Sequence, residues 1–359
     1  QASGHDKDSS MSNPYSHISE HTVTLGSHEM FYLAAGPKEG PLVIFSHGWP
    51  ELGYSWRHQL PVLGSLGFRA IAPDLRGHGR SSLYARHDDY TMEKHVADLI
   101  GLLDSLGRDK AIWVGHDWGS VVAWSLVSHH PERSLAVANL CVPYATFEGG
   151  LERLISLVDR TVYPEDEYPA GQWDYMCFYE ENFERATTVF EANTESFVKA
   201  LFRSTFAENG RGVPAMTATI RRDGGWFNGL DAAPDLPRDA EVISEEDLEV
   251  YVKALKRTGF FGTDSFYMNH EANNQYFQTR KNDGYLDMPA LFLTASYDYV
   301  CECVDSDLPV PMREQCRDLT EFTVESGHWM AQEKPVDVNN ALVHWLANSV
   351  PDVWPVPPL

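Results

Sequence analysis

Cysteine is scarce and scattered in this sequence of 359 residues. The five cysteines form no C-x-x-C pair, and their odd number and wide spacing fit neither a disulfide framework nor a structural zinc site. They are Cys141, Cys177, Cys301, Cys303 and Cys316. We therefore expect neither a disulfide scaffold nor a bound metal ion or cofactor, and a reducing, cytoplasmic compartment.

Basic residues are also few, with 28 Lys and Arg against 52 Asp and Glu, which gives a formal charge of −24. Such a surface repels phosphate backbones and anionic bilayers, so we expect no nucleic-acid or membrane-surface partner. No run approaches the ~18 apolar residues of a membrane-spanning helix. Residues 1–20 lack the apolar centre of a secretory signal and are interpreted as an N-terminal extension or tag remnant, because a native start could lie at Met11.

The first 145 residues alternate short apolar runs with helical patterns. The stretch 91–107 places leucines and a valine on one helical stripe, with Thr91 as a candidate N-cap and Gly107 as a candidate stop. Continuous apolar runs that end in turns are typical of strands buried on both faces. These runs are 41–48, 69–74, 110–115 and 134–143. The alternation predicts a mostly parallel sheet covered by helices on both faces.

The amino-acid composition changes between residues 145 and 285, where Tyr, Phe, Glu and Asn replace the Val- and Ile-rich runs. Strand-like runs resume at 288–298 and 319–328 and are followed by a last helix. We therefore predict one α/β core interrupted by an inserted, mainly helical cap. The predicted boundaries are 21–144 and 286–359 for the core and 145–285 for the cap.

The sharpest local motif is VGHDWGS at residues 114–120. A buried strand ends at Gly115, a helix follows, and Asp117 stands at the tip of the turn between two glycines. Glycines two positions before and after a central residue let strand and helix approach closely and push that side chain into the open. This is the pattern of a nucleophile elbow, G-x-S-x-G, with aspartate in place of serine. On the pattern alone, a helix-capping role for Asp117 is an equal alternative.

Two later residues complete a chain order typical of that motif, in which an acid and then a histidine follow the elbow on later strand ends. Asp298 closes the run 288–298, and His328 follows LTEFTVE (319–325) near the end of the run 319–328. Three such residues rarely fall on strand ends in this order by chance, so we predict a triad of Asp117, Asp298 and His328. Asp305 and Glu148 are weaker candidates for the acid.

The segment SHGWP (46–50) follows the first buried strand, where an oxyanion hole takes its second backbone donor. We predict the N–H groups of Trp49 and Trp118 as the two donors and their side chains as apolar walls around the reacting carbon. His47 and Pro50 are interpreted as structural, as is the Gly-rich loop DLRGHGRS (74–81), which lacks a phosphate-binding pattern.

These motifs resemble those of the α/β-hydrolase-fold epoxide hydrolases of the soluble type. The resemblance rests on HGWP, DLRGHGRS, GHDWGS and SGHW, with ASYDYV around Asp298, and covers nearly the whole chain from about residue 20. The family binds the epoxide oxygen with two cap tyrosines, one in a D-Y-Q-like and one in a W-Y-R-N-like segment. WDYMCFY (173–179) matches with Tyr175, and GFFGTDSFYMN (259–269) matches with Tyr267. The departures from these patterns are Met176, Phe266 and Met268.

The resemblance implies an enzyme that opens a hydrophobic epoxide to a vicinal diol. Asp117 would form an alkyl ester, which water activated by His328 and Asp298 would hydrolyse, while Tyr175 and Tyr267 donate to the epoxide oxygen. A carboxylate suits an sp³ carbon because it is already ionised near pH 7 and needs no base. Epoxide and water are the implied partners, with no cofactor, and we expect a monomer while leaving a dimer open.

Three other functions are alternatives to this one. A haloalkane or haloacetate dehalogenase would use the same Asp nucleophile and histidine, but a leaving halide favours indole or amide N–H donors over two phenols. A ligand receptor on an inactive hydrolase fold would be expected to lack part of the triad. A carboxylesterase would carry serine at the elbow. The substrate stays open among fatty-acid, terpenoid and aryl epoxides.

Overall fold

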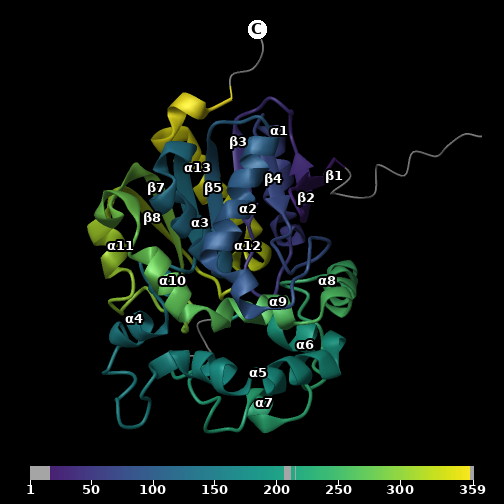
Figure 1. Ribbon diagram of the computed structural model, residues 1–359, viewed down its shortest axis with the longest axis vertical. Coiled ribbons are helices and arrows are strands. Elements are labelled where there is room, and N and C mark those ends of the chain that lie inside the picture. Colours follow the sequence, from purple (N-terminus) through teal and green to yellow (C-terminus); the bar gives the residue numbers. More distant parts are fainter. Residues whose placement is uncertain (1–16, 206–211, 215, 356–359) are drawn as a thin grey trace, which may run out of the picture.

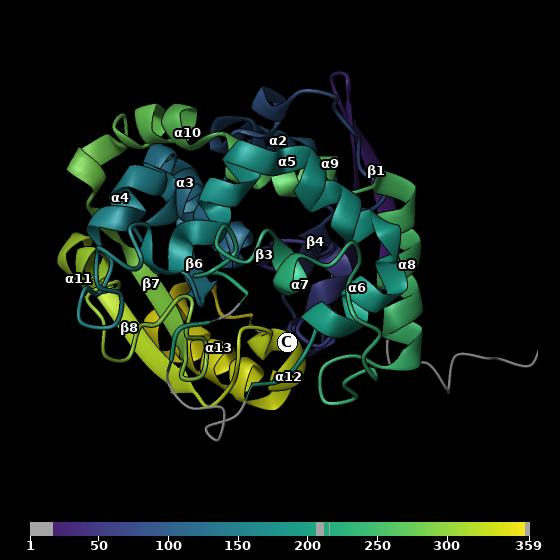
Figure 2. The same ribbon diagram turned by 90° about the horizontal axis from the view of Figure 1, so that it is seen from below.

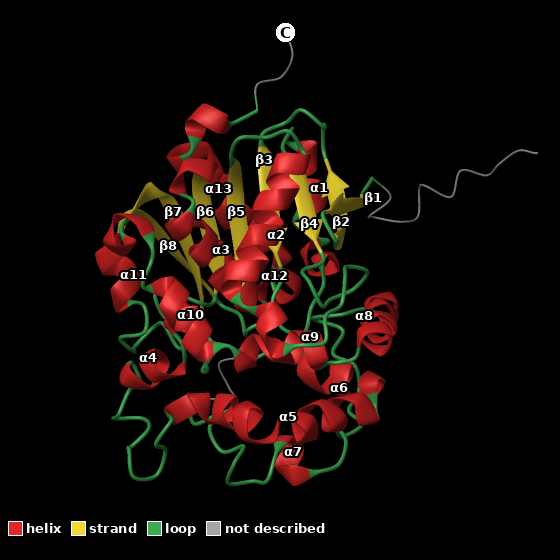
Figure 3. Ribbon diagram, in the orientation of Figure 1, coloured by secondary structure: helices red, strands yellow, loops and turns green. Residues whose placement is uncertain are grey.

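A computed structural model describes residues 17–205, 212–214 and 216–355. Its centre is one sheet of eight strands in the order β1-β2-β4-β3-β5-β6-β7-β8 (Figure 1, Figure 3). Strands β3 to β8 pair in parallel, whereas β2 pairs antiparallel with both β1 and β4. The strands are β1 (Ser19–Leu25), β2 (His28–Ala35), β3 (Leu42–Ser46), β4 (Arg69–Pro73), β5 (Ala111–His116), β6 (Ser134–Leu140), β7 (Leu286–Ala295) and β8 (Cys316–Val324). The predicted mostly parallel sheet is confirmed.

Helices cover both faces of the sheet because its parallel strands are apolar on both sides. Two separate apolar clusters result. On one face, Leu99 and Val122 pack from α2 and α3; on the other, Leu63 and Trp345 pack from α1 and α13. The core helices are α1 (Leu60–Ser65), α2 (Met92–Ser105), α3 (Trp118–His129), α11 (Val310–Gln315), α12 (Met330–Glu333) and α13 (Pro335–Ser349).

The predicted helix over 91–107 corresponds to α2. The side chain of Thr91 accepts a hydrogen bond from the N–H of Lys94, as an N-cap does. Gly107 has a φ of +67°, the left-handed conformation that commonly ends a helix. Both signals read from the sequence are therefore confirmed at this helix.

The stretch between β6 and β7 contains helices and no strand within its described residues. In Figure 1 these helices lie below the sheet, and Figure 2 shows α5, α6 and α7 in front of the strands when the molecule is seen from below. The helices are α4 (Leu151–Ser156), α5 (Asp174–Ala192), α6 (Thr194–Leu201), α7 (Trp226–Gly229), α8 (Glu245–Thr258), α9 (Phe261–Asp264) and α10 (His270–Phe277). The division at residues 145 and 285 stays a proposal.

The N-terminal hairpin of β1 and β2 was not among the predicted strands. Its first strand alternates exposed and half-buried residues along Ser19–Leu25 and forms the edge of the sheet. Residues 1–16 of the predicted extension lie outside the described ranges, and β1 begins at Ser19, inside the segment interpreted as extension. Within the described ranges, no helix combines the length and the apolar character that crossing a membrane requires.

Candidate active site

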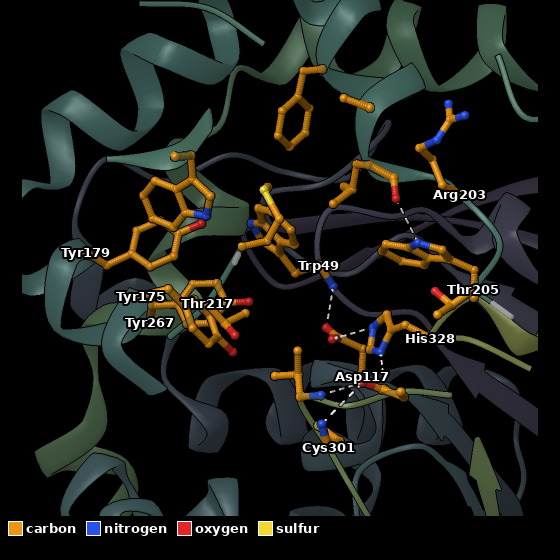
Figure 4. A pocket seen from close by; sticks show the side chains of 18 of the residues that line it. Trp49, Asp117, Tyr175, Tyr179, Arg203, Thr205, Thr217, Tyr267, Cys301 and His328 are labelled. Carbon is orange, nitrogen blue, oxygen red and sulfur yellow. Dashed lines mark hydrogen bonds and ion pairs between the residues drawn. The ribbon is translucent and has the colours of Figure 1, made fainter. Parts of the chain in front are cut away.

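The turn between β5 and α3 has the geometry of a strained elbow. Asp117 has φ 56° and ψ −129°, a combination that non-glycine residues rarely adopt. The two flanking glycines allow it, because a Cβ at Gly115 would collide with the backbone of Gly119, and a Cβ at Gly119 would collide with the carbonyls of Ser46 and His47. Strand, turn and helix thus approach closely, and the Asp117 side chain projects into a cavity (Figure 4).

Both oxygens of the Asp117 carboxylate have defined partners. Its Oδ2 accepts hydrogen bonds from the backbone N–H groups of Trp49 and Trp118, at 2.8 and 2.6 Å. Its Oδ1 lies 3.0 Å from Nε2 of His328. The pairing of β3 with β5, which ends at Ser46 opposite Gly115, brings the loop of Trp49 beside the elbow. The two predicted donors therefore face one carboxylate oxygen.

His328 and Asp298 follow the ends of the adjacent parallel strands β8 and β7. The Nδ1 of His328 lies 2.7 Å from Oδ2 of Asp298, and Oδ1 of Asp298 accepts hydrogen bonds from the N–H groups of Val300 and Cys301. Of the alternative acids, Glu148 accepts instead from the N–H of Ala145, and Asp305 is exposed. The structure thus brings together the three residues predicted from chain order.

The electrostatics of the three groups are those of an imidazolium between two carboxylates. Burial alone would lower the pKa of His328, but the charge of Asp298 and the hydrogen bonds to both carboxylates raise it well above its usual value. Burial alone would likewise raise the pKa of Asp117 and of Asp298, but His328 holds both below their usual range. Asp117 is therefore ionised at neutral pH.

Two phenols face this carboxylate from the cap. Tyr175 lies in the first turn of α5, and Tyr267 lies in a 3-10 turn (Ser265–Met268) after α9. Their rings are 5.5 Å apart at 73°, on the opposite side of the cavity from His328 (Figure 4). Burial raises the pKa of both hydroxyls well above the usual value, so both stay protonated at neutral pH.

The cavity between core and cap has a volume of about 270 Å³ and a mostly apolar lining. The indole of Trp49 forms part of its wall, as predicted. The indole of Trp118 was also predicted to line the cavity, but it is fully buried, stacked on Phe266 and in edge contact with Tyr267. The further lining residues are Phe147, Tyr179, Phe197, Ala200, Leu201, Arg203, Thr205, Met216, Thr217, Trp226, Val300, Cys301 and Trp329.

Sequence reasoning missed a buried network behind the triad. The Nδ1 of His116 lies 3.1 Å from Oε2 of Glu51, and its Nε2 lies 2.7 Å from the carbonyl oxygen of His328. Burial would lower the pKa of His116, but Cys141 and Glu51 raise it to about 10. The positions of Glu51, directly after HGWP, and of His116, directly before Asp117, were the only available signals.

One group of side chains in the described part of the chain has donor atoms close enough for a metal ion, namely His116, Cys141 and His328. Their donor atoms already have protein partners: His116 contacts Glu51, His328 lies between its two carboxylates, and the Cys141 thiol donates to the carbonyl of His328. The group fits the hydrogen-bond network better than a metal centre.

Comparisons with known proteins agree with this architecture. Residues 41–335 match the family described as alpha/beta hydrolase fold. The chain is 32% identical to epoxide hydrolase A of Mycobacterium tuberculosis over 87% of its own length and 92% of that protein. It is 31% identical to bifunctional epoxide hydrolase 2 of Sus scrofa over 86% of its length, but it spans only about half, 51%, of that relative.

Solved structures give the same result. The crystal structure of epoxide hydrolase A from Mycobacterium thermoresistibile matches with a TM-score of 0.75 and 30% identity, over 92% of this chain and 98% of that one. The structure of the Vigna radiata epoxide hydrolase VrEH1 matches with a TM-score of 0.73 and 29% identity, over 92% and 98%. The chain therefore belongs to the α/β-hydrolase fold family and, within it, to the epoxide hydrolases.

Proposed function

We propose that this chain hydrolyses hydrophobic epoxides to vicinal diols through an ester on Asp117. One observation carries the proposal: an ionised carboxylate faces two protonated phenols across an apolar cavity. The nucleophile and the proton donors that ring opening needs thus stand on opposite sides of the space in which a substrate would lie.

In the first step Oδ1 of Asp117 attacks a ring carbon, and the bond from that carbon to the epoxide oxygen breaks. The oxygen would leave as an alkoxide, a poor leaving group unless it receives a proton. Tyr175 and Tyr267 lie where they can hydrogen-bond this oxygen, and one of them transfers a proton to it. The apolar lining favours a substrate with hydrophobic substituents.

In the second step His328 takes a proton from water, and the resulting hydroxide attacks the ester carbonyl carbon of Asp117. Formation of the ester removes the charge of Asp117 from beside His328, so the pKa of His328 falls. The imidazolium then gives up its proton, which returns to the phenolate left by ring opening, and the neutral imidazole can act as a base. Asp298 keeps it oriented. Negative charge then develops on Oδ2, against the N–H groups of Trp49 and Trp118, each worth roughly 2.7–4 kcal/mol. The intermediate collapses with cleavage of the bond from the carboxyl carbon to Oδ1. The leaving Oδ1 takes the proton of the newly added hydroxyl, which releases the diol and restores the carboxylate.

The dehalogenase alternative is less well supported by this geometry. A leaving halide would need N–H donors directed into the cavity. The indole N–H of Trp49 instead donates to Asp264, and the indole of Trp118 is fully buried behind Tyr267. Halide release against diol formation, measured on matched substrates, separates the two activities.

Turnover in ¹⁸O-water tests the ester route. Because water attacks the carbonyl carbon, repeated turnover should place label in the Asp117 carboxylate, detected by mass spectrometry of its peptide. The peptide carrying Asp74 serves as an internal control and should stay unlabelled. Diol formation with an unlabelled Asp117 peptide would refute the covalent mechanism. In a His328→Gln variant the ester should form but persist, which intact mass would reveal.

A further inference from the structure

A buried carboxyl in the cap contacts both halves of the site. Asp264, the last residue of α9, is 0% exposed. Its Oδ1 accepts a hydrogen bond of 2.7 Å from the indole N–H of Trp49 in the core and one of 3.1 Å from the hydroxyl of Tyr179 in the cap. Its Oδ2 has no hydrogen-bond partner within the described residues.

The core contact of Asp264 leads to the nucleophile. Trp49 donates through its side chain to Asp264 and through its backbone N–H, at 2.8 Å, to Oδ2 of Asp117. The hydrogen bond to Asp264 joins residues 215 positions apart and fixes the orientation of an indole that forms part of the cavity wall. The placement of one oxyanion donor is thereby linked to the placement of the cap.

The cap contact of Asp264 leads to the phenols. The ring of Tyr179 stacks on that of Tyr267, with centroids 4.4 Å apart and planes inclined by 4°. Tyr267 follows Asp264 by three residues and also contacts Trp49 edge to face. Asp264 thus has contacts on both sides of the space between the carboxylate and the phenol.

An aspartate side chain is seldom fully buried unless it has partners. Burial of an acid costs free energy, and an apolar side chain of similar volume would avoid that cost. Burial raises the pKa of Asp264 well above its usual range, although the hydrogen bonds from Trp49 and Tyr179 lower it. Burial thus favours the neutral form, and what the side chain supplies is an oxygen that accepts from one N–H and one O–H group.

We propose that Asp264 is a positioning residue for ring opening, which holds the oxyanion loop of the core and the phenol donors of the cap in register. The proposal rests on the proposed epoxide hydrolysis. It implies that loss of the acceptor slows formation of the Asp117 ester more than it weakens substrate binding, because small displacements of reacting groups cost up to ~100-fold in rate.

The test measures ester formation in the His328→Gln chain, by rapid quenching with racemic styrene oxide and intact mass. Asp264→Leu should slow single-turnover ester formation by about 10- to 100-fold at saturating epoxide. Asp264→Asn keeps a neutral side chain with an acceptor oxygen and should restore the rate to within about threefold. Rescue of the rate by Asn distinguishes positioning from bulk packing.

Two further variants isolate the hydrogen bond. Trp49→Phe keeps the backbone donor and an aromatic wall but removes the indole N–H, so it should also slow ester formation. This variant tests the hydrogen bond independently if Asp264→Leu fails to fold. The variant that combines Trp49→Phe with Asp264→Leu should form ester no more slowly than Asp264→Leu alone, since both changes remove the same hydrogen bond. As a control, Tyr54→Phe deletes another core-to-cap hydrogen bond of 2.7 Å, to Asp247, and should leave the rate unchanged.

Ester formation at the unaltered rate in Asp264→Leu or in Trp49→Phe would overturn the positioning role. An equal loss of rate in Tyr54→Phe would also overturn it, since any weakened contact between core and cap would then suffice. Absence of ester in the His328→Gln chain with Asp264 intact, despite turnover of styrene oxide by the unaltered chain, would instead refute the proposed ester route.

Discussion

At the scale of single residues, the site separates charge from proton donors. His328 holds Asp117 ionised from one side, and burial keeps Tyr175 and Tyr267 protonated on the other. A carboxylate in this state can attack without prior deprotonation. The chemical difference from a serine elbow thus lies in one side chain and in the two phenols that face it.

The phenols can be tested together. Tyr175→Phe or Tyr267→Phe alone should lower kcat, with one donor remaining, whereas the double variant should lose the ~10²–10⁴-fold contribution of general acid catalysis. Diol formation from styrene oxide measures the effect. Tyr144→Phe is the control, because its hydroxyl donates to the carbonyl of Gly284 away from the cavity, and it should retain activity. Normal turnover by the double variant would exclude both phenols as proton donors.

The triad could be proposed from sequence because its members follow strand ends in a fixed order. The contact of Trp49 with Asp264 could not, since it joins residues 215 positions apart and depends on how the cap packs. The side chain of Trp118 was also misplaced: its position directly after Asp117 suggested that its indole lines the cavity. Its fully buried indole follows from the direction in which α3 leaves the elbow.

At the scale of elements, the elbow depends on the close approach of β3, β5 and α3. A side chain at Gly119 would collide with the backbone carbonyls of Ser46 and His47, which cannot move without shifting β3. The helix could then no longer present the N–H of Trp118 to Asp117. Backbone packing and oxyanion geometry are therefore determined by the same contact.

Two glycine variants compare this packing with intrinsic helix propensity. Gly119→Ala should lower the free energy of unfolding by about 1–3 kcal/mol through overpacking and also reduce kcat. Gly101→Ala, in α2, meets only the Leu25 side chain at 3.4 Å and should stabilise by about 0.5–1 kcal/mol with activity unchanged. Urea unfolding and diol assays measure both. Equal stability changes in the two variants would contradict the packing argument.

The parallel strands were predictable because burial on both faces makes them continuous apolar runs. The hairpin β1–β2 was missed because its edge strand, SEHTVTL, is exposed or half-buried throughout and contains polar residues at most positions, which give a weak signal. The cap was predicted as helical from its lack of such runs. Its internal arrangement depends on aromatic contacts between helices, and the local periodicity of the sequence does not predict such contacts.

At the scale of the whole molecule, many titratable groups are buried. Burial lowers the pKa of His78, His270 and His58 to about 4, and the charge of Arg57 further lowers that of His58. Burial also raises the pKa of Asp74 to about 6 and of Glu148 to about 7, although backbone hydrogen bonds lower both. The three histidines lower the free energy of unfolding as the pH falls, because the unfolded chain binds their protons first. The two carboxyls act in the opposite direction, because the folded chain binds their protons first.

We expect net loss of stability as the pH falls from 6.5 to 4. In this window the unfolded chain binds protons at histidines, with a usual pKa of 6.5, that stay neutral in the folded chain. His270→Leu should remove one such site. Between pH 7 and pH 5 the free energy of unfolding of the variant should therefore fall by about 2 kcal/mol less than that of the unaltered chain. Chemical denaturation at the two pH values measures this difference, and parallel pH profiles for both chains would contradict it.

The occupied pair of donors at Asp117 has a consequence for chemical profiling. Fluorophosphonate reagents label α/β hydrolases by reacting with an elbow serine and placing a phosphoryl oxygen between the two backbone N–H groups. Here the elbow carries no hydroxyl, and the N–H groups of Trp49 and Trp118 already bind the carboxylate. In a proteome treated with such a reagent, this elbow would remain unlabelled, and an electrophile that alkylates carboxylates would be needed to detect it.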